Sequence, residues 1–202
     1  MKVAEQLQEP QAEPAWEIAH LFPLQGEWSV DDYLALETNQ LVEYANGHVE
    51  VLPMPSPRHQ DIVFFLQRMI WNFIAGRKLG KVLAAPLPIE LWPKKYREPD
   101  LIFIFTHKLD QQAATHWREV DLVMEVVSPD NPSRDYKTKR REYAQAGIPE
   151  YWIVDPQQEV ITVLELHGTQ YQLHGEFKAG QAATSVLLAG FTVAVTDVFD
   201  VA

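Results

Sequence analysis

Cysteine is absent from the 202 residues, which excludes disulfide bonds and thiolate metal sites. Long apolar stretches are also missing, because no run reaches the roughly 18 residues that a membrane-spanning helix needs. The first residues, Met-Lys-Val-Ala-Glu-Gln, lack the hydrophobic core that is typical of a secretion signal. Together these absences predict a cytoplasmic protein that does not contact a membrane.

Several motifs of known chemistry are missing too. We find no glycine-rich phosphate loop, no nucleophile elbow and no histidine spacing typical of a zinc site. Basic charge is scarce: 17 basic residues face 28 acidic ones, for a net charge of −11. A nucleic-acid coat protein needs a basic surface, so this class is disfavoured. An enzyme that acts on nucleic acid remains possible, because carboxylates at a metal site contribute to the negative sum.

The composition that remains is that of a folded protein. Hydrophobic residues make up 47% of the chain and charged residues 22%, and the length suits one domain with a full core. Residues 1–22 carry mixed charge without a period and are interrupted by Pro10 and Pro14, so we expect a flexible lead-in. A single domain is then expected over residues 23–202.

Hydrophobic periodicity and turn residues predict the order of the elements. Ser29 and Ser56 are expected to cap helices, with Pro57 in the first turn of the second helix, and Asn46-Gly47 suits a tight hairpin turn. The expected elements are a helix at 28–37, a hairpin at 41–52, a helix from 57 to about 76, strands at 81–91, 100–105 and 121–127, an exposed loop at 106–118, a helix at 133–147, a strand at 150–155 and an antiparallel meander over 159–174. This order predicts an α/β or α+β fold with a mixed β-sheet.

Two acidic residues interrupt apolar strands. Glu125 lies in the middle of a continuous apolar run, and Asp100 opens another, Leu101–Phe105. A buried carboxylate is costly unless it is paired, hydrogen-bonded or bound to a cation. If the strands are neighbours, both residues could hold one Mg²⁺ or Mn²⁺ ion, which would activate water for phosphodiester hydrolysis. The alternative is structural: Asp100 caps a turn, and Glu125 pairs with a core lysine or arginine.

The predicted helix at 133–147 is the basic exception in an acidic chain. Asp135, Lys139 and Tyr143 recur every four residues and should share a face, from which Lys139 could orient water or stabilise charge on a phosphate. The alternative is an ordinary exposed ion pair. Three further residues could contact the phosphates of nucleic acid, or could simply form a solvated helix face: Arg134, Lys137 and Arg140.

Two further candidates carry weaker signals. Glu43 in the hairpin could supply a third acidic ligand, although a hairpin glutamate is usually exposed to solvent. His59, near the start of a helix, could be a ligand or a hydrogen-bonded structural residue. The bases Lys94, Lys95 and Arg97 form a second small basic cluster.

In their order along residues 27–200, several motifs resemble the Uma-type family of putative restriction endonucleases, within the PD-(D/E)XK nuclease superfamily. The stretches that carry the resemblance are the hairpin Val42–Val49, the loop Met54–His59, Glu98-Pro-Asp100, Val123-Met-Glu-Val-Val-Ser-Pro129, the series Asp135, Lys139 and Tyr143, and Gly147-Ile-Pro-Glu-Tyr-Trp-Ile-Val-Asp-Pro156. Two positions depart from the pattern: Val127 stands where the superfamily has lysine, and His48 where the family commonly has an acid.

The resemblance implies a restriction-endonuclease-like core, a mixed sheet flanked by helices, with an added N-terminal hairpin and C-terminal antiparallel strands. It implies magnesium ligands at Asp100, Glu125 and the Val126 carbonyl, with Lys139 in place of the missing lysine. It also implies a DNA substrate and a homodimer. Two alternatives remain: a catalytically inactive nuclease fold that binds nucleic acid or a protein partner, and a metal hydrolase that acts on small phosphorylated molecules.

Overall fold

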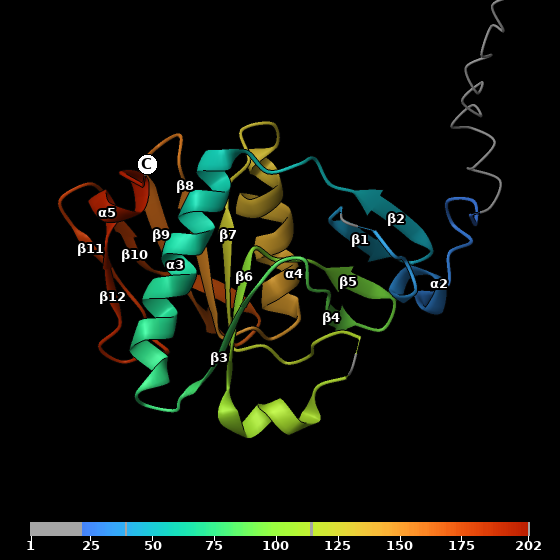
Figure 1. Ribbon diagram of the computed structural model, residues 1–202, viewed down its shortest axis with the longest axis horizontal. Helices are drawn as coiled ribbons and strands as arrows, with labels where there is room; N and C mark the ends of the chain where they lie inside the picture. Colours follow the sequence, from blue (N-terminus) through green and yellow to red (C-terminus); the bar gives the residue numbers. More distant parts are fainter. Residues whose placement is uncertain (1–21, 39, 114, 202) are drawn as a thin grey trace, which may run out of the picture.

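A six-stranded mixed β-sheet forms the centre of the computed structural model, which describes residues 22–38, 40–113 and 115–201 (Figure 1). The strand order is β10-β9-β8-β7-β6-β3, and all neighbours are antiparallel except β7 and β8. The strands span Gly80–Ala84 (β3), Leu101–Phe105 (β6), Leu122–Val126 (β7), Glu150–Asp155 (β8), Val160–His167 (β9) and Gln170–Phe177 (β10). The predicted mixed sheet and antiparallel meander are confirmed.

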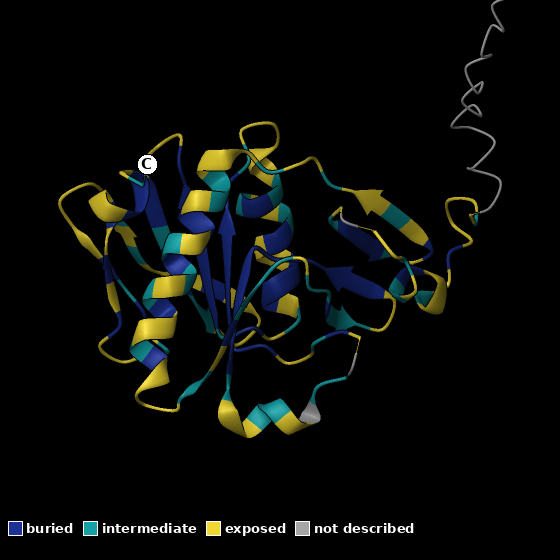
Figure 2. Cartoon of the chain, in the orientation of Figure 1, coloured by how far each residue is buried: buried dark blue, intermediate teal, exposed yellow. Residues whose placement is uncertain are grey.

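Helices cover both faces of this sheet. On β6, Leu101 and Phe103 point to one side and join the core beneath helix α3, Pro57–Ala75. Ile102 and Ile104 point to the other side, where they pack with residues of helix α4, Arg140–Gln145. The alternation of side chains along a strand thus gives two separate apolar cores, one on each face of the sheet. In Figure 2 the strands between the helices are coloured as buried.

Helix α3 forms as its sequence predicts. The Ser56 hydroxyl accepts a hydrogen bond from the His59 N–H, Pro57 occupies the first turn, and the helix ends at Gly76. Its inner face buries Ile62, Val63, Leu66, Ile70 and Ile74 against the sheet.

A second sheet lies beside the first, in the order β2-β1-β5-β4 (Figure 1). Its strands span Val42–Ala45 (β1), His48–Val51 (β2), Ile89–Trp92 (β4) and Lys95–Arg97 (β5). Asn46 and Gly47 have φ of 49° and 86°, so the predicted hairpin turn is confirmed. Ser29 caps the short helix α2, Val30–Leu34, as predicted, and this helix packs on the sheet through Tyr33.

Three expectations were wrong or incomplete. The single strand predicted over 81–91 is two strands, β3 and β4, which belong to different sheets, and β5 was not predicted. The segment 106–118 is not a plain loop, because it begins with a 3₁₀ helix, Thr106–Gln111, and His116 is buried. The basic helix is π-helical over Arg134–Lys139 before it continues as α4.

The C-terminal part closes the core on the α3 side. It comprises the strand pair β11 (Ala182–Thr184) and β12 (Thr192–Ala194) and the short helix α5, Val195–Phe199. The flexible lead-in expected over residues 1–22 lies, apart from Phe22, outside the described residues. Among the described helices, none is long and apolar enough to cross a membrane.

Candidate active site

The register of β6 and β7 brings the two predicted carboxylates together. Leu101 pairs with Met124 and Ile102 with Val123, and this alignment, continued by one residue beyond the start of β6, places Asp100 beside Glu125. Facing residues of such a pair have Cβ atoms about 5 Å apart and point to the same side of the sheet. The sequence prediction that these strands are neighbours is therefore confirmed. Both side chains lie on the face covered by α4.

Asp100 is held by two partners. Its Oδ2 atom accepts a hydrogen bond from the Val126 N–H at 2.7 Å and lies 3.2 Å from His59 Nε2. Burial alone would lower the pKa of His59, but the hydrogen bond with Asp100 and the carboxylate charges raise it above its ordinary value. Asp100 therefore favours the protonated form of His59, against the effect of burial. The histidine thus lies next to the carboxylate pair, whichever role it has.

Glu125 is held by the basic helix. Lys139 Nζ lies 2.8 Å from Glu125 Oε2, and the Tyr143 hydroxyl donates to Oε1. Lys139 Nζ also lies 3.3 Å from Asp135 Oδ1. The structure therefore brings Asp135, Lys139 and Tyr143 to one face, as their spacing predicted. All four side chains are buried, so the alternative of an exposed Asp135–Lys139 pair is wrong.

Burial and charge oppose each other at this cluster. Burial raises the pKa of Glu125, and the Asp100 charge adds to that rise, while the Lys139 ammonium counters it. Burial would lower the pKa of Lys139, but the surrounding carboxylates, Glu125 foremost, raise it above its usual value. Lys139 therefore stays charged. The structural alternative for Glu125, a pair with a buried lysine, is also observed.

A cavity of about 170 Å³ opens beside these residues. His59, Asp100 and Lys139 line it, together with Glu125 and Val126. Its other walls come from the two ends of the β1–β2 hairpin and the loop after β2, from Glu98, and from the segment between β7 and the basic helix together with Arg134 and Asp135 of that helix. The volume suits a few waters or one phosphate-sized group rather than a large organic ligand.

Glu43 is not among the residues that line the cavity, and its role as a third acidic ligand stays a prediction. Its buried carboxylate pairs with Arg97 and Arg134. Arg134 also pairs with Glu50, and these bonds hold the pKa of Glu50 below its usual value. Arg134 was expected to contact phosphate. In the structure its guanidinium already binds two carboxylates, those of Glu43 and Glu50.

Sequence reasoning missed Arg97 as a structural connector. Arg97 Nε donates to Glu142 Oε2 at 2.7 Å, and Lys95 Nζ lies 2.8 Å from Glu142 Oε1. Since Arg97 also binds Glu43, it links the second sheet to helix α4. The signal in the sequence was that β5 carries a base, Arg97, and β1 carries an acid, Glu43. The pairing of β1 with β5 that joins them is not visible locally.

The remaining basic candidates face solvent. Lys137 and Arg140 are both exposed on the basic helix, and Arg140 Nη2 donates to the Tyr171 carbonyl at 3.3 Å. Their side chains could contact a bound polyanion without any change in the helix. The basic helix therefore has a buried face toward the carboxylates and an exposed basic face.

The donor set fits a hard divalent cation. Asp100 and Glu125 offer carboxylate oxygens on one side of the sheet, at the wall of the cavity. Magnesium is often bound by only one or two carboxylates, with waters and phosphate oxygens as the other ligands. The described residues contain no group of three or more His, Asp or Glu side chains arranged as a metal site, so a cage made of protein ligands alone does not fit.

Comparison with known proteins agrees with this fold. A crystal structure of a putative nuclease belonging to DUF820, from Anabaena variabilis ATCC 29413, superposes with a TM-score of 0.71 over 85% of this chain and 97% of that chain, at 18% identity. At this identity the likeness shows the fold. No curated protein matches the sequence. The sequence model of the Uma2 family, described as putative restriction endonuclease, matches residues 30–196, so the chain belongs to this family.

Proposed function

We propose that the protein is a divalent-metal-dependent endonuclease that hydrolyses phosphodiester bonds in DNA. Membership of the family supports a nuclease-like function. The observation that carries the proposal is the placement of Asp100 opposite Glu125 at a small cavity, with the Lys139 ammonium between Glu125 and Asp135. A carboxylate pair with an adjacent cation is the equipment that phosphoryl chemistry needs.

In this proposal Asp100 and Glu125, with the Val126 carbonyl, hold Mg²⁺ or Mn²⁺. The bound ion supplies a Lewis acid and lowers the pKa of a coordinated water. The protein side chains fix and complement this site. Tyr143 orients Glu125 by its hydrogen bond, His59 and the Val126 N–H orient Asp100, and Lys139 presents a positive charge to the phosphate.

The proposed polyanion contacts come from the exposed face of the basic helix. Lys137 and Arg140 are exposed, and Arg140 has donors besides the one bound to Tyr171, while Arg134 acts by holding Glu43 and Glu50 in place. We also propose that the protein works as a homodimer, since a duplex has two strands to cut. Such dimers place one active site on each strand.

A non-catalytic nuclease fold that binds nucleic acid or a protein is the second candidate. The observation in its favour is that Lys139 already neutralises Glu125 within the fold. The superfamily lysine is also replaced by Val127, which is buried and apolar. Such a protein would keep the architecture and bind its partner without cleavage.

Plasmid cleavage distinguishes these candidates. We expect wild type to nick supercoiled DNA with Mg²⁺ or Mn²⁺, and Asp100→Asn to cut at least about a hundredfold more slowly. Substitution of residues that only support metal ligands already costs about 10–100-fold in activity, and Asp100 is proposed to be a ligand itself. Asp110→Asn, an exposed acid in the 3₁₀ helix, is the matched control and should cut normally. Binding without cleavage would favour the non-catalytic fold. Cleavage of a small phosphodiester but not of DNA would indicate a hydrolase of small phosphorylated molecules.

A further inference from the structure

The outer face of helix α3 exposes large apolar side chains. Phe64 is 63% exposed and Trp71 is 55% exposed, although both lie on a helix whose inner face is fully buried. Exposed residues recur along α3 at alternating steps of four and three: Pro57, Asp61, Phe64, Arg68, Trp71 and Ala75. This spacing places the six residues along one stripe, in which Phe64 and Trp71 are the large apolar side chains, so a second helix could pack along it.

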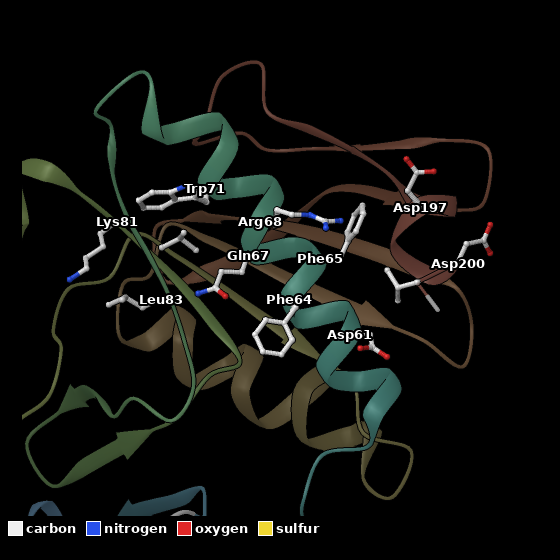
Figure 3. Close-up of a pocket in the computed structure, with 12 residues that line it drawn as sticks. Asp61, Phe64, Phe65, Gln67, Arg68, Trp71, Lys81, Leu83, Asp197 and Asp200 are labelled. Atoms are coloured by element: carbon white, nitrogen blue, oxygen red, sulfur yellow. The ribbon is translucent and has the colours of Figure 1, made fainter.

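A shallow pocket of about 1100 Å³ extends along the flanks of α3, with Lys81 and Leu83 of β3 on one side and Asp197 and Asp200, in and just after α5, on the other (Figure 3). It shares no lining residue with the cavity at the carboxylates. Charges of both signs border it: Arg68 and Lys81 are basic, and Asp61, Asp197 and Asp200 are acidic. Three carboxylates disfavour a nucleic acid as the occupant. A surface of mixed charge with exposed aromatic residues is typical of a protein interface.

We propose that the exposed outer face of α3 packs against α3 of a second copy of the chain, with the two helices antiparallel about a two-fold axis. This inference rests on the homodimer of the proposed function and gives it an interface. In an antiparallel seam the alternating positions face each other in pairs. We place the two-fold axis between Phe64 and Arg68, so that Phe64 lies opposite the partner's Arg68 and Asp61 lies opposite the partner's Trp71. Each contact occurs twice, because the interface is isologous.

The facing side chains are chemically matched. The guanidinium of Arg68 can stack on the Phe64 ring of the other copy, as it already lies 5.4 Å from the Phe65 ring within its own helix. The Trp71 indole N–H can donate to the Asp61 carboxylate of the other copy. A parallel arrangement would instead place Arg68 against Arg68 and Asp61 against Asp61, so like charges exclude it.

Reversal of charge across the seam tests the interface. We expect wild type to sediment as a dimer, and Phe64→Arg to raise the dimer dissociation constant about a hundredfold, since it places two arginines together in two symmetry-related contacts. Adding Arg68→Glu to Phe64→Arg should restore the dimer through two new ion pairs. Leu173→Arg, at a site on β10 that is 61% exposed, is the matched control and should remain dimeric.

Sedimentation velocity separates three claims: the homodimer, the α3 interface and the antiparallel pairing. A monomeric wild type would overturn both this inference and the homodimer. A dimeric Phe64→Arg variant would overturn the α3 interface and leave a homodimer formed elsewhere. A variant that loses the dimer but is not rescued by Arg68→Glu would overturn the antiparallel pairing. All substituted residues are exposed, and unchanged melting temperatures would show that folding is intact.

Discussion

Glu125 is a charged side chain in a strand whose neighbours are otherwise apolar, and the fold accommodates it with a lysine and a tyrosine from one helix. A buried ion pair is a weak source of stability when it is intact. It becomes costly when one partner is lost, because the other charge stays buried without compensation. Lys139 and Glu125 should therefore be strongly coupled in stability.

A double-mutant cycle measures that coupling. Lys139→Met alone should destabilise the protein by about 3–5 kcal/mol, since Glu125 and Asp135 would keep buried charge without the ammonium. Glu125→Gln combined with Lys139→Met should cost less than the sum of the single changes, by about 0.5–3 kcal/mol. Urea unfolding of the four proteins gives the values. Additive costs would mean that the two side chains do not interact energetically.

Glu142 gives a second residue-scale prediction, on pH. Burial raises its pKa, but the bonds from Arg97 and Lys95 outweigh burial and hold the pKa below its usual value. A lowered folded-state pKa means that ionised Glu142 stabilises the protein above its unfolded pKa. That stability is lost as the pH falls through the folded pKa.

The comparison of wild type with Glu142→Gln tests this. The difference in unfolding free energy should be constant above about pH 5 and should shrink as the pH falls below about 4. Denaturant titrations across that range measure it. A difference that stays constant down to pH 3 would show that the Glu142 carboxylate is not stabilised by its two bases.

At the scale of elements, the hairpin of β1 and β2 is fixed by its turn and by a close backbone approach. Gly47 has φ of +86°, its carbonyl accepts hydrogen bonds from Gly26 and Trp28, and a Cβ atom on Gly47 would lie 2.5 Å from the Gly26 carbonyl oxygen. The segment before α2 is thereby held against the turn. The hairpin in turn positions Glu43 for its two arginines.

Gly47→Ala should therefore cost more than backbone strain alone. Gly168→Ala is the matched control, because Gly168 also has positive φ, +65°, but a Cβ atom there would meet nothing within 4 Å. We expect about 1–2 kcal/mol for the control and about 1–3 kcal/mol more for Gly47→Ala. Thermal unfolding of both variants decides this. Equal losses would mean that the Gly26 contact is unimportant.

Local chemistry explains which elements could be predicted from the sequence. The Asn46-Gly47 turn and the Ser56 cap depend on a few adjacent residues, and both are confirmed. The assignment of β3 and β4 to different sheets depends on distant partners, so an apolar run at 81–91 could not reveal it. The pairing of Glu43 with Arg97 and Arg134 joins three separate segments and was missed for the same reason.

The candidate site divides in the same way. Asp100 and Glu125 could be found because a carboxylate in an apolar strand is conspicuous. Lys139 and Tyr143 followed from helical spacing, which survives the π-helical segment well enough to keep them on one face. The contact of His59 with Asp100 depends on how the first turn of α3 is placed against the sheet, which the local sequence does not specify.

At the scale of the whole molecule, a chain with net charge −11 must bind a polyanion through a local basic surface. The exposed face of the basic helix is the proposed surface. Lys137→Gln should weaken DNA binding and reduce the magnitude of the salt slope by about one, if Lys137 contacts one phosphate. Lys178→Gln, an exposed lysine at the end of β10, should leave both unchanged. Fluorescence anisotropy at several salt concentrations measures the slopes, and equal slopes for all three proteins would contradict this surface.

The central claim is that Asp100 and Glu125 hold a divalent cation, and thermal unfolding with and without Mn²⁺ tests it most directly. A ligand at about 100 times its dissociation constant stabilises by about 2.7 kcal/mol. For a chain of this length that is roughly 5–10 °C in melting temperature. We predict this shift for wild type and for Asp110→Asn, and its loss in Asp100→Asn. An equal shift in Asp100→Asn, or no shift in wild type even with duplex DNA present, would contradict the account.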